Sequence, residues 1–211
     1  MVTLAGVGKQ YGRGRAVLVD VDLAVRAGDV VAVVGGNGSG KSTLLRIMAG
    51  ITAPTTGTRT DVPRSIGYVP ERFPASTRMS AHSYLRHMGR IRGLSTRIAG
   101  ERADELLERL KLEPGPDFAI RDLSKGNAQK VAVAQSLITR PELLILDEPW
   151  SGLDSSAHGT LSELIAETAL AGSAVVFTDH RESVSRVEAS KRYEIEDGRV
   201  RRSLQRRQGH R

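Results

Sequence analysis

The chain has 211 residues, of which 39% are hydrophobic and 26% charged, a composition typical of a folded globular protein rather than a disordered or fibrous one. The absence of cysteine excludes disulfide bonds, thiol nucleophiles and cysteine-ligated metal sites. No apolar run approaches the roughly 18 residues of a membrane-spanning helix, and no signal-peptide core is visible, which favours a cytoplasmic location.

The net charge of +7 is concentrated at the C-terminus. Residues 199–211 carry six arginines and no acidic residue, so 25 basic and 24 acidic residues remain elsewhere. Such a block is typical of a solvated tail, and the alternative is attraction to anionic lipid headgroups or to an acidic partner. Because aromatic residues make up only 4% of the chain, a base-stacking surface for nucleic acid is not expected.

The expected strands have two kinds of hydrophobic pattern. Residues 19–25 alternate in polarity, which predicts an antiparallel edge strand with one buried face. Residues 30–34, 143–146 and 174–177 are apolar almost throughout, which predicts central strands covered on both faces. Near the end of the chain, Asp197 and Gly198 predict a hairpin turn.

Helical patterns separate these strands. They cover residues 41–49, 102–112, 124–139 and 161–170, and each ends near a glycine or proline. Strands that alternate with helices predict an α/β domain with a mostly parallel sheet. We expect one domain over residues 1–211, in which residues 1–72 and 140–198 form the α/β core, 73–139 a helical subdomain and 199–211 a basic tail.

A glycine-rich motif follows the first central strand. Residues 35–43 match G-x-x-x-x-G-K-[ST] and open a predicted helix, the context of a phosphate-binding loop. Backbone N–H groups of such a loop surround phosphate oxygens, and the helix N-terminus adds positive charge. We expect Lys41 to contact the β- and γ-phosphates and the Ser42 hydroxyl to bind Mg²⁺. The nucleotide-binding residues expected here are Gly35, Asn37, Gly38, Ser39, Gly40, Lys41, Ser42 and Thr43.

Two carboxylates follow the central strand 143–146. The carboxyl ends of such strands are where open α/β sheets bind ligands. Asp147 suits the coordination of Mg²⁺, and Glu148 suits a base that orients the attacking water.

Between these motifs, residues 123–129 read Leu-Ser-Lys-Gly-Asn-Ala-Gln. The three motifs together resemble the ATP-binding subunit of ABC transporters, and the resemblance covers nearly the whole chain. It implies an ABC ATPase fold of the P-loop NTPase class, with a mostly parallel sheet, an antiparallel β edge and a helical subdomain insert. It also implies that Tyr11 stacks on adenine, that His180 contacts the γ-phosphate, and that Ser124 and Gly126 contact the nucleotide of a partner subunit. Glu71 stands where the family has a glutamine that senses Mg²⁺, and we expect it to act at the metal.

The resemblance also implies a function. The implied function is the binding and hydrolysis of ATP with Mg²⁺. Two ATPase subunits, as a homodimer or a heterodimer, would close around ATP and open again after its hydrolysis. A separate transmembrane permease sets the cargo and holds the subunit at the inner face of the cell membrane. Residues 123–129 resemble the signature motif of the family, and Lys125 in this signature and the short chain resemble bacterial exporter systems. The alternative is a soluble ABC-type ATPase that acts on nucleic acid or ribosomes, which only the arginine tail favours.

Overall fold

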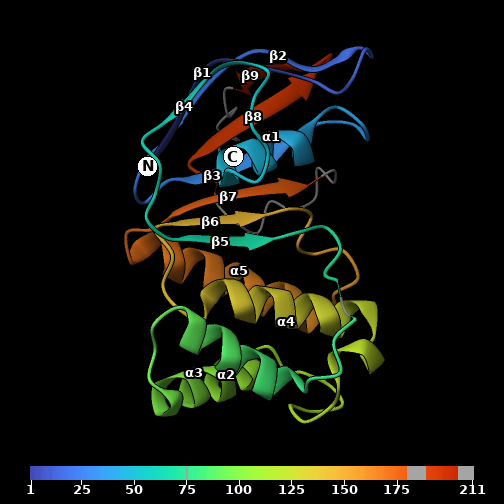
Figure 1. Ribbon diagram of the computed structural model, residues 1–211, viewed down its shortest axis with the longest axis vertical. Helices are drawn as coiled ribbons and strands as arrows, with labels where there is room; N and C mark the ends of the chain where they lie inside the picture. The colour runs from blue at the N-terminus through green and yellow to red at the C-terminus, as the bar shows by residue number, and fades with distance from the viewer. Residues whose placement is uncertain (75, 180–188, 204–211) are drawn as a thin grey trace, which may run out of the picture.

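Nine strands form two sheets in the computed structural model, which describes residues 1–74, 76–179 and 189–203 (Figure 1). The smaller sheet is antiparallel, with the order β2-β1-β4, and the larger has the order β5-β6-β7-β3-β8-β9. The strands are β1 (Val2–Gln10), β2 (Ala16–Val25), β3 (Val30–Val34), β4 (Thr56–Thr60), β5 (Ile66–Val69), β6 (Leu143–Leu146), β7 (Ala174–Asp179), β8 (Lys191–Glu196) and β9 (Arg199–Ser203).

The three apolar runs are neighbouring central strands, as their pattern predicts. They are β6, β7 and β3, they pair in parallel, and every residue of β6 and β7 is buried. The antiparallel strand predicted at residues 19–25 is β2, at the edge of the smaller sheet. The predicted mostly parallel sheet with an antiparallel β part is therefore confirmed. Because β3, β6 and β7 run the same way, the residues that follow them lie at one edge of the sheet.

Helices cover both faces of the larger sheet (Figure 1). Helix α1 (Lys41–Ala49) lies between the two sheets, where four apolar side chains of its inner face are buried: Leu44, Leu45, Ile47 and Met48. Helices α4 (Lys125–Leu137) and α5 (Ser155–Leu170) cover the opposite face. The structure thus places the phosphate-loop helix between the two sheets.

The segment predicted as a helical subdomain, residues 73–139, contains α4 and two further helices. Helices α2 (Ala81–Ile91) and α3 (Thr96–Arg109) pack against each other and against α4, and a short 3₁₀ helix spans Ile120–Asp122. The expected starts of α3 and α5, at residues 102 and 161, were too late, because each helix begins about one and a half turns earlier at a polar cap. The Ser95 hydroxyl accepts a hydrogen bond from the Ile98 amide, and the Asp154 carboxylate accepts one from the Ala157 amide.

The basic tail expected from residue 199 is not a tail over residues 199–203. These residues form β9, which pairs with β8 across the predicted turn at Asp197 and Gly198. In this register Arg199 lies opposite Glu196 and Arg201 opposite Glu194, so the sheet matches these arginines with glutamates. Residues 204–211 lie outside the described residues.

Among the described residues, no helix combines the length and the apolar character that crossing a bilayer requires.

Candidate nucleotide site

The glycine-rich loop connects β3 to α1 at the carboxyl edge of the larger sheet. Gly40 caps α1 with a φ of 107°, and a Cβ atom there would lie 2.9 Å from the carbonyl oxygen of Val17. Only glycine therefore fits this position. Lys41 follows as the first helical residue, and its Nζ donates hydrogen bonds to the carbonyl oxygens of Gly35 at 2.8 Å and Gly36 at 3.0 Å. The lysine is held inside the curve of its own loop and is only 6% exposed.

A pocket of about 380 Å³ opens above this loop. It combines the loop with two acidic residues that are distant in the sequence, and it is lined by Val17, Asn37, Gly38, Gly40, Lys41, Ser42, Thr43, Glu71 and Glu148. Beside it, the Ser39 hydroxyl is buried and has no hydrogen-bond partner within the described chain. A lysine, backbone N–H groups at a helix N-terminus and unused hydroxyl groups together form a site for phosphate oxygens.

Asp147 is almost fully buried at the end of β6. Its Oδ1 accepts a hydrogen bond of 2.8 Å from the Thr178 hydroxyl, whereas Oδ2 is buried without a partner among the residues described. A buried carboxylate oxygen without a partner is costly unless a cation or a bound water satisfies it. Burial, and then the negative charge of Asp147, raise the pKa of the neighbouring Tyr68. The Asp147 carboxylate therefore lies in surroundings from which water is largely excluded.

These donors fit Mg²⁺. The Ser42 hydroxyl and the Glu71 carboxylate line the pocket, and both are the hard oxygen ligands that Mg²⁺ prefers. Within the described ranges, no three histidine, cysteine or acidic side chains form a metal cage.

Glu148 lines the same pocket with an unusual backbone. Its φ is 49°, a left-handed conformation that non-glycine residues rarely adopt. The Glu148 amide donates a 2.9 Å hydrogen bond to the hydroxyl of Thr178, the same group that donates to Asp147. One buried hydroxyl on β7 therefore supports both acidic residues. Sequence reasoning missed Thr178, although a polar residue directly after the apolar run 174–177 was the available signal.

Ser124, Gly126 and Tyr11 are not among the residues that line the pocket. Ser124 caps α4, with its hydroxyl accepting a 3.2 Å hydrogen bond from the Asn127 amide. Neither Ser124 nor Gly126 lines the pocket of its own chain. Tyr11, just beyond β1, is 49% exposed, and the Nζ of Lys9 lies 4.9 Å from its ring centroid. His180 lies outside the described residues.

Known proteins are similar in sequence over most of the chain. The sequence model of the family described as "ABC transporter" matches residues 18–151. The "Nod factor export ATP-binding protein I" of Cupriavidus metallidurans is 35% identical over 191 residues, which cover 85% of this chain and 63% of that protein. The "Zinc import ATP-binding protein ZnuC" of Cereibacter sphaeroides is 38% identical over 171 residues, which cover 80% and 68%. The chain thus spans somewhat less than two thirds of the Nod factor export protein.

Solved structures are similar over nearly the whole chain. A structure described as "Dimeric structure of a post-hydrolysis state of the ATP-binding cassette MJ0796 bound to ADP and Pi" has a TM-score of 0.84 and 28% identity, and covers 96% of this chain and 98% of that chain. Another, described as "Structure of ATP binding subunit of ABC transporter", has a TM-score of 0.87 and 26% identity, with 96% and 89% covered.

Proposed function

The chain belongs to the ABC transporter family and has its ATPase fold, and we propose that it binds and hydrolyses ATP to power a transporter whose cargo a separate permease selects. The observation that carries the proposal is the single pocket that joins the phosphate loop to Glu148 and Glu71, with Asp147 beside it.

We propose that the triphosphate binds where the Lys41 ammonium group now meets its own loop. The Lys41 Nζ contacts two backbone carbonyls, and a phosphate oxygen would attract this cation more strongly because the contact joins opposite charges. The first N–H groups of α1 point toward the same region and add partial positive charge. The exposed ring of Tyr11 would stack on the adenine.

Asp147, Ser42 and Glu71 would hold Mg²⁺, which supplies positive charge that offsets the charge of the phosphates. Glu148 would accept a hydrogen bond from the attacking water and orient it toward the γ-phosphate. Its position depends on the hydrogen bond from its amide to Thr178, since its left-handed backbone is unfavourable without support. We assign His180 a contact with the γ-phosphate on the resemblance alone.

Ser124 and Gly126 do not line the pocket of their own chain, and we propose that they contact the nucleotide of a partner subunit. The similar MJ0796 structure is described as dimeric and bound to ADP and Pi, which supports a dimer. Closure on ATP and opening after its hydrolysis would then convert phosphate chemistry into motion. The partner is a second copy of the chain or a related ATPase subunit.

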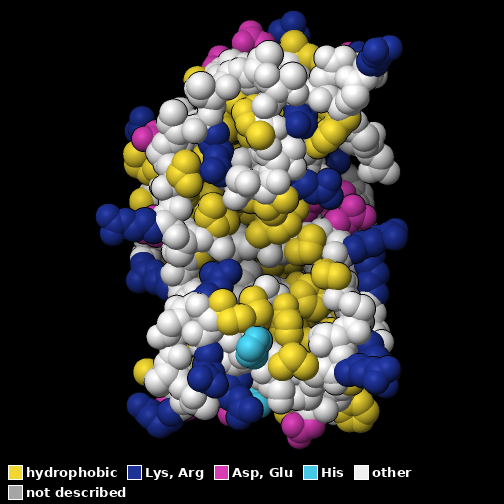
Figure 2. All heavy atoms as spheres, viewed as in Figure 1, with side chains coloured by type: hydrophobic (Ala, Val, Ile, Leu, Met, Phe, Trp, Pro, Cys, Tyr) yellow, Lys and Arg dark blue, Asp and Glu magenta, His cyan; other side chains and the backbone are white. Residues whose placement is uncertain are grey.

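The permease would dock beside the pocket, on the helical subdomain 73–139 and the segment before it. Figure 2 shows apolar side chains gathered over the part of this face where Figure 1 places β5 and α4. In the same part of the chain, the partly buried rings of Phe73 and Tyr84 have centroids 6.0 Å apart, and Ile91 at the end of α2 is 65% exposed. This docking would hold the subunit at the cytoplasmic face of the membrane. Four of the similar proteins are named for Nod factor export, which supports export, and one is named for zinc import.

The test is the Glu148→Gln variant, which keeps the shape of the pocket and removes the base. We expect ATP binding to persist, phosphate release to stop, and a stable ATP-dependent dimer to appear in size-exclusion chromatography. Hydrolysis at the parent rate would refute the role of Glu148, and a variant that stays monomeric at saturating ATP would refute the dimer.

A further inference from the structure

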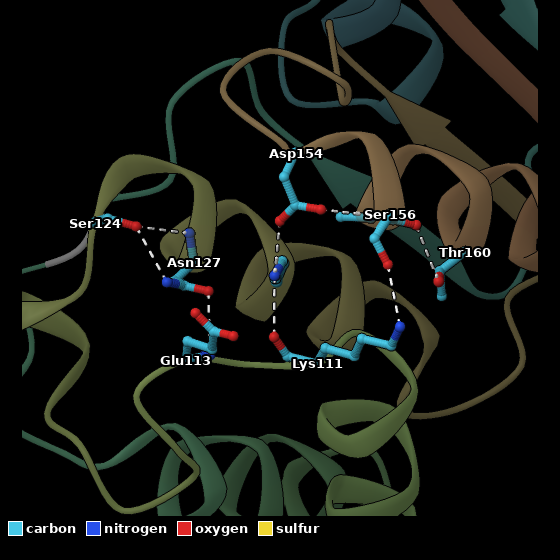
Figure 3. A network of polar contacts seen from close by, with 9 residues as sticks. Lys111, Glu113, Ser124, Asn127, Asp154, Ser156 and Thr160 are labelled. Carbon is cyan, nitrogen blue, oxygen red and sulfur yellow. Dashed lines mark hydrogen bonds and ion pairs between the residues drawn. The ribbon is translucent and has the colours of Figure 1, made fainter.

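Three lysines connect the helical subdomain to the chain segment that follows Glu148. The Nζ of Lys125 donates to the Ser151 hydroxyl at 3.1 Å, and the Nζ of Lys111 donates to the Ser156 hydroxyl at 3.1 Å. Between them, the Nζ of Lys130 lies 3.4 Å from the Asp154 carboxylate. We call Lys111, Lys125 and Lys130 the lysine clasp, and Figure 3 shows the part of it around Lys111, Asp154 and Ser156.

Lys130 is the buried member of the clasp. Its side chain is only 6% exposed, and its Nζ also donates a 3.0 Å hydrogen bond to the carbonyl oxygen of Lys111. A buried ammonium group is stable only while such partners are in place, so Lys130 fixes the chain after α3 to the start of α5. Lys111 itself has a φ of 49°, a left-handed conformation that these contacts hold in place.

Direct backbone packing reinforces the clasp. A Cβ atom on Gly126 would lie only 2.3 Å from the carbonyl oxygen of Gly152, so the start of α4 and the segment 151–156 approach as closely as backbones allow. The aliphatic part of Lys125 lies over Gly152 at the same place. The contact therefore does not depend on flexible side chains alone.

The segment 151–156 is connected to Glu148 by backbone hydrogen bonds and by the buried side chain of Trp150. The Ser151 amide donates a 3.0 Å hydrogen bond to the Glu148 carbonyl, and the Leu153 amide donates one to Trp150. Trp150 is buried edge-on against Phe177, with ring centroids 5.1 Å apart. Two consecutive hydrogen-bonded turns restrict the motion of the backbone between Glu148 and Leu153, so a displacement of Ser151 moves the backbone of Glu148.

We propose that Lys111, Lys125 and Lys130 are positioning residues for hydrolysis, which connect the helical subdomain mechanically to Glu148. A rotation of that subdomain then changes the position of the base, while the phosphate loop, which the clasp does not touch, keeps its affinity for ATP. Lys125 occupies the third position of the signature and adds a contact that a glycine there would lack. The inference rests on the proposed ATPase activity.

The test compares Lys125→Met, Ser151→Ala and the double variant, whose changes are at the surface and spare the core. We expect each single change to lower kcat by about three- to tenfold with little change in KM for ATP, as the loss of one coupled contact implies. The double variant should lose no more than either single one, and Lys125→Arg should restore most of the rate. Hydrogen exchange should become faster at the Ser151 amide, because that amide bonds to the Glu148 carbonyl.

Lys191→Met is the matched control, since it removes a lysine ion pair to Asp29 that lies outside the clasp. It should lower stability without lowering kcat. Lys130→Met and Lys130→Arg apply the same two changes to Lys130, the buried lysine of the clasp. Parent-like kcat and exchange in Lys125→Met and Lys130→Met would overturn the proposal, as would losses of kcat that merely follow the melting temperature. A parent protein that binds ATP but hydrolyses none would instead overturn the proposed function, and the clasp proposal with it.

Discussion

Thr178→Val removes one hydroxyl that supports both acidic residues of the site. Thr178 is fully buried, and valine has nearly the same shape, so the core packing is kept. The substitution takes away the 2.8 Å hydrogen bond to the Asp147 carboxylate and leaves the Glu148 amide without its acceptor. The first loss costs roughly 1.5–3 kcal/mol, and leaving the partly buried Glu148 amide unsatisfied costs at most roughly 1–3 kcal/mol.

We therefore expect Thr178→Val to lower the free energy of unfolding by about 3–5 kcal/mol, since the two losses share one group and do not add fully. For a chain of 211 residues this corresponds to a fall in melting temperature of roughly 10 °C. Thermal and urea unfolding, followed by circular dichroism and by Trp150 fluorescence, would measure both quantities. ATP hydrolysis should fall more than ATP binding, because Glu148 loses its support and the phosphate loop does not.

The control is Thr178→Ser, which keeps the hydroxyl and loses a buried methyl group worth about 1 kcal/mol. It should retain most of the hydrolysis rate. If Thr178→Val unfolds within about 1 kcal/mol of the parent, or is as active as Thr178→Ser, then the hydroxyl does not support the two acidic residues and the reasoning is wrong.

Three further variants test separate parts of the site and the fold. Lys41→Ala should weaken ATP binding and nearly abolish hydrolysis, because the cation that lies in the loop is lost; isothermal titration calorimetry measures this, and parent-like affinity would contradict it. Glu71→Gln should leave ATP affinity nearly unchanged and alter turnover and its dependence on Mg²⁺ concentration, whereas an unaltered Mg²⁺ titration would remove Glu71 from the metal site. Glu167→Gln should destabilise the fold at pH 7 by about 0.5 kcal/mol, because an exposed pair contributes little. Two hydrogen bonds from Arg109 lower the pKa of Glu167 below its usual 4.5, so the pair stabilises above that pH, and the difference from the parent should vanish as pH falls through the lowered pKa.

The features of this molecule that the sequence predicts well are formed by residues close together in the sequence. The phosphate loop is contiguous over residues 35–43, and its glycines, lysine and flanking strand are sufficient to place it between β3 and α1. The central strands follow from uninterrupted apolar runs, because only strands covered on both faces remain apolar throughout. The cap of α4 at Ser124 is local too, since a hydroxyl three residues before an amide satisfies it.

What sequence reasoning missed depends on pairing between distant segments. The arginines of residues 199–203 appeared as a tail because their partner strand β8 supplies the opposing glutamates only once the hairpin forms. Thr178 follows an apolar run as any threonine could, and its role arises from Asp147 and Glu148, about thirty residues earlier. The three lysines of the clasp are scattered among 31 basic residues, and nothing in their spacing relates them to residues 151–156.

ATP binding depends on contacts between residues close in the sequence, whereas ATP hydrolysis depends on contacts between distant segments. In the proposed function, Lys41 and the loop would hold phosphate through contacts within nine consecutive residues, so ATP affinity should survive changes elsewhere. The position of Glu148 depends instead on distant residues. Its strained backbone is supported by Thr178 on β7, and it is connected through Ser151 to the helical subdomain. A partner that moves that subdomain would therefore change the hydrolysis rate before it changed the affinity for ATP. Under the proposed function, ATP would then stay bound until the permease moves the subdomain.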